Sequence, residues 1–382
     1  MRPVAINVRN YVLVVIALAA FSFYAPLAVV SGQGMPRGGS RVEGEKIFKS
    51  ACAACHGADG RGTPKEIAGF EKPRTFPDFT ACDQTTPEPN TAWKDVILHG
   101  GPARGFSDIM PSFGEALTSE QIDDVIVFLR GLCRNPRWAR GELNLPRALV
   151  TEKAYPEDEV VVSTAVNARG TPGVMNHIIY EQRIGMNYQL EADVPITFLD
   201  EKHVWYGGVG DTTLALKRVM FSSLRTGSIM SLQGGVLLPT GNKARGFGTG
   251  TTTFEGFASV NQLFPTNTFV QIKFGGDLPR HTDIFPQSIF FQSAVGQSIA
   301  ANHGLGRLWS PMFEFVAARD LVDNAKTNWD VLPQMQVTIS KRQHVRANLG
   351  VRVPVNNTAG RPVQVVFYLL WDFFDGRLNE GW

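Results

Sequence analysis

The chain has 382 residues, which is long enough for two domains, and its formal net charge is +2. A nearly balanced charge gives no indication of a nucleic-acid partner. Charged residues make up only 19% of the chain, whereas glycine and phenylalanine are plentiful, with 38 and 25 residues. This composition favours an all-β or outer-membrane type of chain over a helical one.

Residues 1–32 have the pattern of an export signal peptide. Two arginines precede the apolar run Tyr11–Phe23, and small residues follow it around Ser31, where we expect cleavage. The alternative is an uncleaved anchor helix, because Tyr11–Val30 is uncharged and long enough to span a bilayer. In both cases the rest of the chain is expected to leave the cytoplasm.

Residues 52–56 read Cys-Ala-Ala-Cys-His, which is the most specific motif of the chain. Cys52 and Cys55 can each form a thioether bond to one vinyl group of haem, and the adjacent His56 then ligates the iron. A structural disulfide or half of a zinc site is the alternative use of the two cysteines. The flanking segments decide between these uses.

Two predicted helices flank the motif and favour haem attachment. Ser40 and Glu43 have the spacing of a capping box, which predicts a helix that leads into the two cysteines. Thr118 and Gln121 repeat that spacing before an apolar stripe of helical period, which predicts a second helix over 119–132. The two helices are expected to cross.

The loop before the second helix offers a sixth ligand for the iron. Met110 lies there among glycines and prolines, and a thioether sulfur opposite an imidazole raises the reduction potential of haem iron. His99 is the competing candidate, with a solvent-facing position as its expected role. A backbone carbonyl near Pro73 is expected to accept a hydrogen bond from His56 Nδ1 and to orient the ring.

Taken in order, Gly44, the Cys-Ala-Ala-Cys-His motif, Met110 and the terminal helix resemble a class I cytochrome c. The resemblance covers residues 40–135. It implies a small all-α domain around one covalently bound haem c, with His56 and Met110 as the axial ligands of the iron.

The other two cysteines, Cys82 and Cys133, lie outside the haem motif. The chain is expected to be exported and its count of four cysteines is even, so we predict a disulfide between these two. No cysteine follows residue 133, which excludes a disulfide scaffold for the second half of the chain.

Residues 136–158 contain three prolines and end in an acidic run, and we expect them to form a linker. Over 159–382, apolar and polar residues alternate, as in Val345–Val353, which is typical of strands with one apolar face. We predict about twelve strands, near residues 159–168, 175–184, 187–198, 213–222, 228–238, 253–264, 267–275, 286–298, 307–319, 330–341, 343–355 and 362–374.

Long and short breaks alternate between these strands, which predicts an antiparallel transmembrane β-barrel with short periplasmic turns and longer outer loops. The long breaks include Leu199–Asp211 and Gly275–Phe285. A soluble β-sandwich is the alternative, but long strands with charged faces disfavour it. A folded cytochrome domain, with a radius of gyration of about 13 Å, is too large for the lumen and is expected at the periplasmic mouth.

The second half also resembles the porin-type barrels grouped with the phenol-degradation outer-membrane family, at residues 207–211, 237–241 and 350–375. As a whole, the chain is similar in plan to the fused cytochrome–porins of iron-oxidising bacteria. This second resemblance implies a chain that moves electrons across the outer membrane.

The leading hypothesis is a monohaem cytochrome that is anchored in the outer membrane and faces the periplasm, an electron carrier rather than an enzyme. Its expected partners are a periplasmic redox protein and outer-membrane lipid, without nucleic acid. One alternative is a conduit that takes electrons from an extracellular donor such as Fe(II). The other is a solute pore with a docked cytochrome, since polar residues such as Glu191 and Arg352 are expected to line the lumen.

Overall fold

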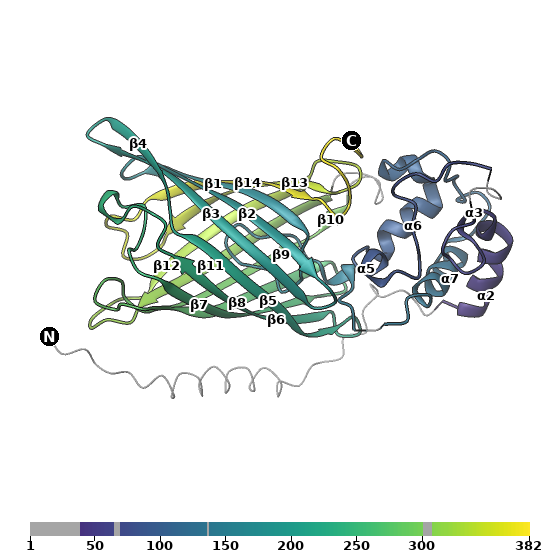
Figure 1. The fold of residues 1–382 in the computed structure, drawn as a ribbon, viewed down its shortest axis with the longest axis horizontal. Helices are drawn as coiled ribbons and strands as arrows, with labels where there is room; N and C mark the ends of the chain where they lie inside the picture. The colour runs from purple at the N-terminus through teal and green to yellow at the C-terminus, as the bar shows by residue number, and fades with distance from the viewer. Residues whose placement is uncertain (1–38, 65–68, 136, 301–307) are drawn as a thin grey trace.

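The computed structural model describes residues 39–64, 69–135, 137–300 and 308–382, so the predicted signal peptide at 1–32 lies outside the described residues. A small helical domain lies at one end of a long β-barrel, and the C-terminus lies at that same end (Figure 1). Among the described residues, no helix has the length and apolar character needed to cross a membrane.

The helical domain contains the two predicted crossing helices. The first helical stretch runs through α2 (Arg41–Ile47), a π-helical turn (Phe48–Cys52) and α3 (Ala53–His56). The second is α7 (Ser119–Arg130), which packs against α2. The remaining helices of the described domain are α5 (Cys82–Thr85), α6 (Asn90–His99) and the short turn Gly101–Arg104.

Local capping starts both crossing helices, but in different ways. At α7, Thr118 and Gln121 form the complete capping box that the sequence predicts. At α2, the Ser40 side chain accepts from the Glu43 backbone N–H, as expected, whereas the Ser40 backbone N–H donates to Asp124 Oδ1 at 2.6 Å. The start of α2 is therefore tied both to its own first turn and to α7.

The crossing of α2 and α7 depends on Gly44. A Cβ atom built on Gly44 would lie 1.9 Å from the backbone oxygen of Asp124, which is far inside van der Waals contact. We expect Gly44→Ala to force the helices apart and to lower the free energy of unfolding of the helical domain by about 1–3 kcal/mol. Chemical denaturation followed by helical circular dichroism measures this loss, and Val42→Ala, an exposed position on the same helix, is the control. Equal stabilities of the two variants would contradict the close contact.

The predicted barrel is confirmed as a closed antiparallel sheet of twelve strands, because β1 pairs with β14 and β9 pairs with β11. Its strands agree with the prediction to within a few residues at each end. They are β1 (Glu159–Arg169), β2 (Gly173–Ile184), β3 (Tyr188–Glu201), β5 (Thr212–Ser223), β6 (Ser228–Leu238), β7 (Thr253–Leu263), β8 (Thr268–Pro279), β9 (Ser288–Gln297), β11 (Leu308–Asp320), β12 (Asn328–Thr338), β13 (Val345–Pro354) and β14 (Val363–Asp372).

Two of the predicted long breaks are wrong in part. Leu199–Asp211 contains the end of β3 and a further strand, β4 (Val204–Val209), which pairs with β3 beyond the barrel proper (Figure 1). Gly207 in β4 leaves space for an aromatic ring, since a Cβ at this position would meet the Phe198 ring at 2.6 Å. Gly275–Phe285 likewise begins inside β8. The two-residue strand β10 (Ile299–Ala300) adds one short pairing to β11.

The barrel wall is apolar outside and polar inside, the reverse of a soluble β-sandwich. On β5, Leu214 and Leu216 are both 47% exposed, whereas the next residue, Lys217, is 1% exposed. The same alternation places exposed apolar side chains on the other strands, including Ile178, Leu190, Leu232, Ile272, Phe291, Phe315, Met335, Leu349 and Phe367. Polar side chains are buried on the inner face, including Glu181, Gln189, Gln233, Asn261, Gln271, Glu314, Gln336 and Asn348. This arrangement suits a barrel surrounded by lipid.

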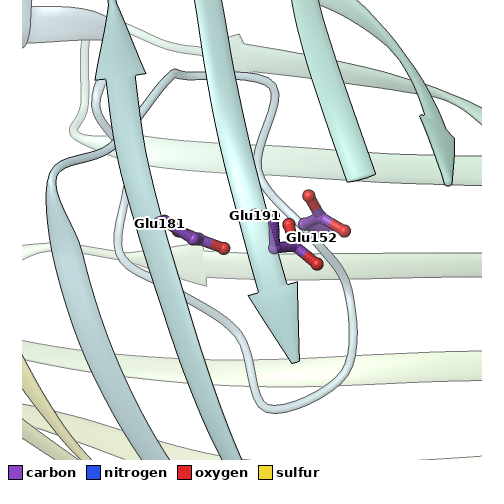
Figure 2. A group of neighbouring side chains, drawn as sticks. All are labelled: Glu152, Glu181 and Glu191. Carbon is purple, nitrogen blue, oxygen red and sulfur yellow. The ribbon is translucent and has the colours of Figure 1, made fainter. Parts of the chain in front are cut away.

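The segment that was expected to be a linker is not an extended connection between the domains. Residues 137–158, here called the luminal segment, fold into the barrel lumen. Pro146 accepts from Gln271 on β8, and Glu157 N donates to Gln189 on β3 at 2.7 Å. Glu152 of this segment lies beside Glu191 on β3 (Figure 2). The segment contains one short 3-10 helix, Gly141–Leu143, and is otherwise irregular, and its polar groups pair with the wall.

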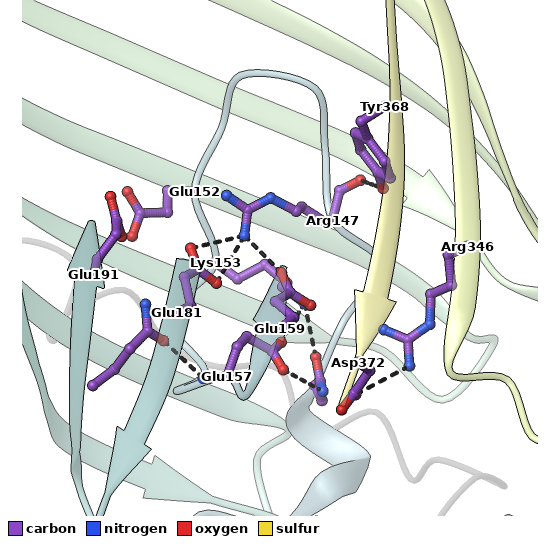
Figure 3. A network of polar contacts seen from close by, with 12 residues as sticks. Arg147, Glu152, Lys153, Glu157, Glu159, Glu181, Glu191, Arg346, Tyr368 and Asp372 are labelled. Carbon is purple, nitrogen blue, oxygen red and sulfur yellow. Dashed lines mark hydrogen bonds and ion pairs between the residues drawn. The ribbon is translucent and has the colours of Figure 1, made fainter. Parts of the chain in front are cut away.

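Two buried charges of opposite sign hold the luminal segment. Arg147 lies 2.7 Å from Glu159 and 2.9 Å from Glu181, two wall carboxylates that are fully buried (Figure 3). On the other side of the lumen, Glu314 accepts hydrogen bonds from three successive backbone N–H groups of the segment, at residues 149–151. Charge-assisted bonds of this kind are about twice as strong as neutral ones, so the segment is firmly fixed.

The helical domain is docked at the barrel end that carries short turns, such as residues 185–187, 224–227 and 264–267. Asn135 Nδ2 lies 2.8 Å from the sulfur of Met186 in one of these turns, and Arg183 donates to the backbone oxygen of Asp83. The longer connections at residues 239–252 and 280–287 lie at the opposite end. The expectation that the folded domain sits at a barrel mouth agrees with this arrangement (Figure 1).

Candidate functional site

The two motif cysteines lie where the π-helical turn passes into α3, and both are free thiols. Cys52 packs against the apolar core of the helical domain. Burial, with a smaller contribution from Cys55, raises the pKa of Cys52 to about 11. The Cys52 thiol is therefore protonated at neutral pH.

His56 ends α3 and is enclosed by aromatic rings. Its ring stacks on Phe76 with centroids 4.9 Å apart and lies 5.3 Å from the ring of Phe79. Burial, together with the charge of Lys72, lowers the pKa of His56 to about 4. The imidazole is thus neutral at physiological pH and can ligate a metal through a ring nitrogen.

The expected orienting bond to His56 is not formed in the structure. The Pro73 carbonyl accepts instead from the Phe76 backbone N–H at 2.9 Å, which closes a turn. His56 Nδ1 is buried and has no hydrogen-bond partner among the described residues. The ring is positioned by stacking on Phe76, and a second ring nitrogen engaged by iron would leave Nδ1 as the protonated atom.

Met110 lies in the loop before α7, and His99 is exposed at the end of α6. The Met110 backbone oxygen accepts from Gly101 N at 2.9 Å, which fixes the loop, and its side chain packs against the same apolar cluster as Cys52. The cluster consists of Phe48, Phe79, Ile97, Ile122, Val125, Ile126, Phe128 and Leu129. The structure therefore brings Met110 to the core that the motif also faces and leaves His99 in solvent.

This set of groups fits a c-type haem. The Cys52 thiol and the Met110 thioether pack against one apolar core, and the neutral His56 ring contacts Phe79 of that core. With the second free thiol at Cys55, these groups make up the donor set of a covalently attached, His/Met-ligated haem. The unpaired Nδ1 of His56 fits the same reading, because an iron-bound histidine keeps its proton on the other ring nitrogen. When bound, the haem supplies a one-electron Fe(III)/Fe(II) couple.

A disulfide between Cys82 and Cys133 is present, with Cα atoms 5.1 Å apart. It joins α5 to the chain that leaves α7, on the side of the domain that faces the barrel (Figure 1). The bond keeps these two cysteines out of reach of the motif thiols, which agrees with the predicted division of the four cysteines.

Residues 40–129 match the protein family described as cytochrome c oxidase, cbb3-type, subunit III. These residues form a c-type cytochrome domain. The match covers the motif, both crossing helices and Met110, and it supports haem c as the cofactor of this cytochrome domain. No curated protein matches the chain.

Solved structures that are similar to the barrel are bacterial porins and channels. The KdgM porin is 8% identical with a TM-score of 0.36, over 56% of this chain and 99% of that one. The NanC porin is 7% identical with a TM-score of 0.40, over 56% and 98%. An outer membrane channel from Pseudomonas putida F1 is 12% identical with a TM-score of 0.38, over 59% and 99%. The barrel itself is established by its strand pairings.

A second group of acidic residues lies in the lumen, away from the cytochrome domain. Carboxylate oxygens of Glu152, Glu181 and Glu191 lie within 4.8 Å of one another (Figure 2). Two of them are already paired with cations, because Glu152 lies 2.8 Å from Lys217 and Glu181 lies 2.9 Å from Arg147. A metal ion would have to displace these cations, so the group belongs to the ion-pair network of the luminal segment (Figure 3).

Sequence reasoning did not find two features beside the cytochrome site. Phe76 and Phe79 enclose His56, and their spacing within a proline-containing loop gives no periodic signal. Arg342, in the turn between β12 and β13, reaches the cytochrome domain and donates to the backbone oxygen of Gly105. A lone arginine in a barrel turn has no signature that connects it to residues more than two hundred positions away.

Proposed function

We propose that this protein transfers electrons through a single haem c, bound covalently by Cys52 and Cys55 and ligated by His56 and Met110. One observation carries the proposal: in a c-type cytochrome domain, the Cys52 thiol and the Met110 thioether pack against the same apolar core that the neutral His56 ring contacts through Phe79. The proposed role is that of a carrier rather than an enzyme, because a bound haem would supply the redox chemistry and the protein would set its position and potential.

The residues of the site set the potential and protect the cofactor. The Met110 thioether opposite His56 favours the reduced iron and raises the potential. The buried apolar cluster around Phe48 excludes water, which also disfavours the extra positive charge of the oxidised form. Phe76 holds the His56 ring by stacking, so the ligand does not depend on a hydrogen bond for its orientation.

The barrel is proposed to anchor the cytochrome domain in the outer membrane, with that domain in the periplasm. The apolar outer face of the barrel supports contact with lipid. The cytochrome domain lies at the end with short turns, and outer-membrane barrels place their short turns toward the periplasm. The electron partner is then a periplasmic redox protein.

The luminal segment is relevant to the two alternative functions, a solute pore and an electron conduit. The luminal segment bonds to wall strands on several sides of the lumen, namely β1, β3, β8 and β11, which disfavours an open solute pore. An electron conduit from an extracellular donor such as Fe(II) needs a further redox centre in the lumen. The acidic group there is neutralised by Lys217 and Arg147, so no observation favours this conduit.

The test of the proposed function is the cofactor content of the purified full chain. We expect one haem per chain by pyridine haemochrome spectroscopy, and a mass increase of one haem that persists after denaturation. Cys52→Ala together with Cys55→Ala should abolish the attached haem, whereas a barrel-facing cysteine pair, Cys82→Ala with Cys133→Ala, should retain it. Absence of covalent haem from the unaltered chain would refute the proposal.

The side of the membrane is tested on intact cells. A membrane-impermeant reductant is added outside, and the haem spectrum is followed before and after the outer membrane is opened. Reduction only after opening supports a periplasmic cytochrome domain. Fast reduction in intact cells would support the conduit instead.

A further inference from the structure

A cavity of about 330 Å³ lies where the cytochrome domain meets the barrel. One wall is the loop around Arg74, which follows the motif histidine in the chain. A second wall is the loop around Phe106, which precedes Met110. The third wall comes from the barrel and consists of Arg342 and the C-terminal residues Glu380 and Gly381. Two loops of the cytochrome domain, one that follows His56 in the chain and one that precedes Met110, therefore meet the barrel at this cavity.

Arg342 is the buried cation of this cavity. Its side chain is only 6% exposed, its guanidinium carbon lies 4.6 Å from the Phe106 ring centroid, and one nitrogen donates to Gly105 O. Its Nε has no hydrogen-bond partner among the described residues. A buried guanidinium with an unused donor is costly unless an anion accepts from it, and guanidinium groups suit carboxylates well.

The cavity carries more positive than negative charge. Glu380 lies 3.1 Å from Arg342 and 3.0 Å from Arg74, so two arginines share one carboxylate. Arg74 is largely exposed, with 59% of its side chain accessible, and can turn toward the cavity. A further carboxylate at this place would balance the second arginine.

The chemistry of haem attachment says which edge of the cofactor lies nearest the cavity. Thioether bonds at Cys52 and Cys55 tether the vinyl edge of the porphyrin, and the two propionates extend from the opposite edge. Helix α3, which follows Cys52, lies on the side of the domain away from the barrel (Figure 1). The edge of a bound haem opposite to the tether would therefore face the barrel, which is the side on which the cavity lies.

We propose that the barrel completes the haem pocket, with Arg342 and Arg74 receiving the haem propionates in this cavity. The proposal rests on the proposed attachment of haem at residues 52–56. Its consequence is that the potential of the haem depends on the docking of the cytochrome domain, because a barrel residue neutralises the propionates. The barrel is then part of the redox site as well as an anchor.

The test is a redox titration of the purified full chain and its variants. Removal of a cation next to the propionates stabilises oxidised iron, so Arg342→Gln should lower the midpoint potential. The expected change is about tenfold in the ratio of reduced to oxidised haem at a fixed ambient potential. Glu380→Gln removes the competing carboxylate and should raise the potential. Arg342→Lys keeps the charge and should stay near the unaltered protein.

Two further readouts separate this role from a purely structural one. The potential falls as pH rises through propionate ionisation, and Arg342→Gln should move that fall to higher pH. Arg361→Gln removes a paired arginine at the opposite end of the barrel and should leave both the potential and its pH dependence unchanged. Hydrogen exchange at residues 101–107 reports whether the domain stays docked in each variant.

The proposal is overturned if the haem is attached and Arg342→Gln and Glu380→Gln leave the potential unchanged. It is also overturned if both variants shift the potential in the same direction together with loss of docking, because solvent entry would then explain the shift. Absence of haem from the unaltered chain would instead refute the proposed function. Opposite shifts with docking retained support the barrel arginine as a propionate ligand.

Discussion

Met110→His is expected to lower the midpoint potential of the haem strongly while leaving the iron six-coordinate. A second imidazole donates more electron density than a thioether and stabilises the oxidised iron. Axial ligation spans roughly 0.8 V among haem proteins, and exchange of one ligand uses a substantial part of that range. Spectroelectrochemical titration of the full chain measures the shift, and the loss of the sulfur-to-iron charge-transfer band reports the exchange itself.

The matched control for this ligand assignment is His99→Ala. His99 is exposed at the C-terminal end of α6, whereas Met110 packs against the apolar core. The control should therefore keep the potential and the spectrum of the unaltered protein. If His99→Ala changes the spectrum and Met110→Ala does not, His99 is the sixth ligand and the assignment of Met110 is wrong.

The parts of the fold that the sequence predicts correctly are those specified by nearby residues. A capping pair such as Thr118 and Gln121 and a helical stripe act within one or two turns, so α7 could be placed closely. Alternation along a strand is equally local, and it located the barrel strands to within a few residues. The motif at residues 52–56 is set by the chemistry of haem attachment, so it can be recognised from the sequence without knowledge of the fold.

The luminal segment shows why other features could not be predicted. Its prolines and its lack of periodicity are the same in a linker and in a segment packed in a lumen. What distinguishes the two is the partner of each polar group, and Glu314 lies more than 160 residues from the backbone N–H groups that it accepts from. The polar inner face was predicted, but its pairing with residues 137–158 was not.

The cytochrome site shows the same limit on a smaller scale. The ligands were proposed from local order along the chain, and their gathering at one core agrees with that order. The Pro73 carbonyl was wrong as the partner of His56, because it closes a turn with Phe76. That turn depends on the conformation of the loop, which has no repeating pattern from which to read it.

Arg147→Ala is expected to destabilise the barrel and to loosen the luminal segment. Glu159 and Glu181 are both fully buried, and Arg147 is the cation that lies within 3 Å of each. Removal of one partner from a buried ion pair costs about 3–5 kcal/mol, because a charge is left without compensation. Unfolding in denaturant, followed by tryptophan fluorescence, should show a loss of this size in the free energy of unfolding.

The same change should make the barrel conduct ions. Arg147→Ala removes the side-chain bonds that hold the luminal segment to Glu159 on β1 and Glu181 on β2. The backbone oxygen at this position can still accept from Tyr368 on β14, so the segment should loosen without leaving the lumen. In planar bilayers we expect the unaltered chain to be silent or nearly so and Arg147→Ala to open measurable, fluctuating conductance.

A compensating variant separates loss of charge balance from loss of packing. Glu181→Gln in the Arg147→Ala background removes one of the two unpaired carboxylates and should recover part of the stability. Lys341→Ala, an exposed lysine in the β12–β13 turn, changes a charge outside the lumen and should alter neither stability nor conductance.

Equal conductance from the unaltered chain and from Arg147→Ala would mean that residues 137–158 do not block the lumen. That result would support a solute pore as a second function of the protein, in addition to electron transfer. A barrel that conducts only when the Arg147 ion pairs are broken would instead mean that the charged residues of the inner wall hold the luminal segment in place and keep the lumen closed. A closed barrel is consistent with a role as a membrane anchor for the cytochrome domain.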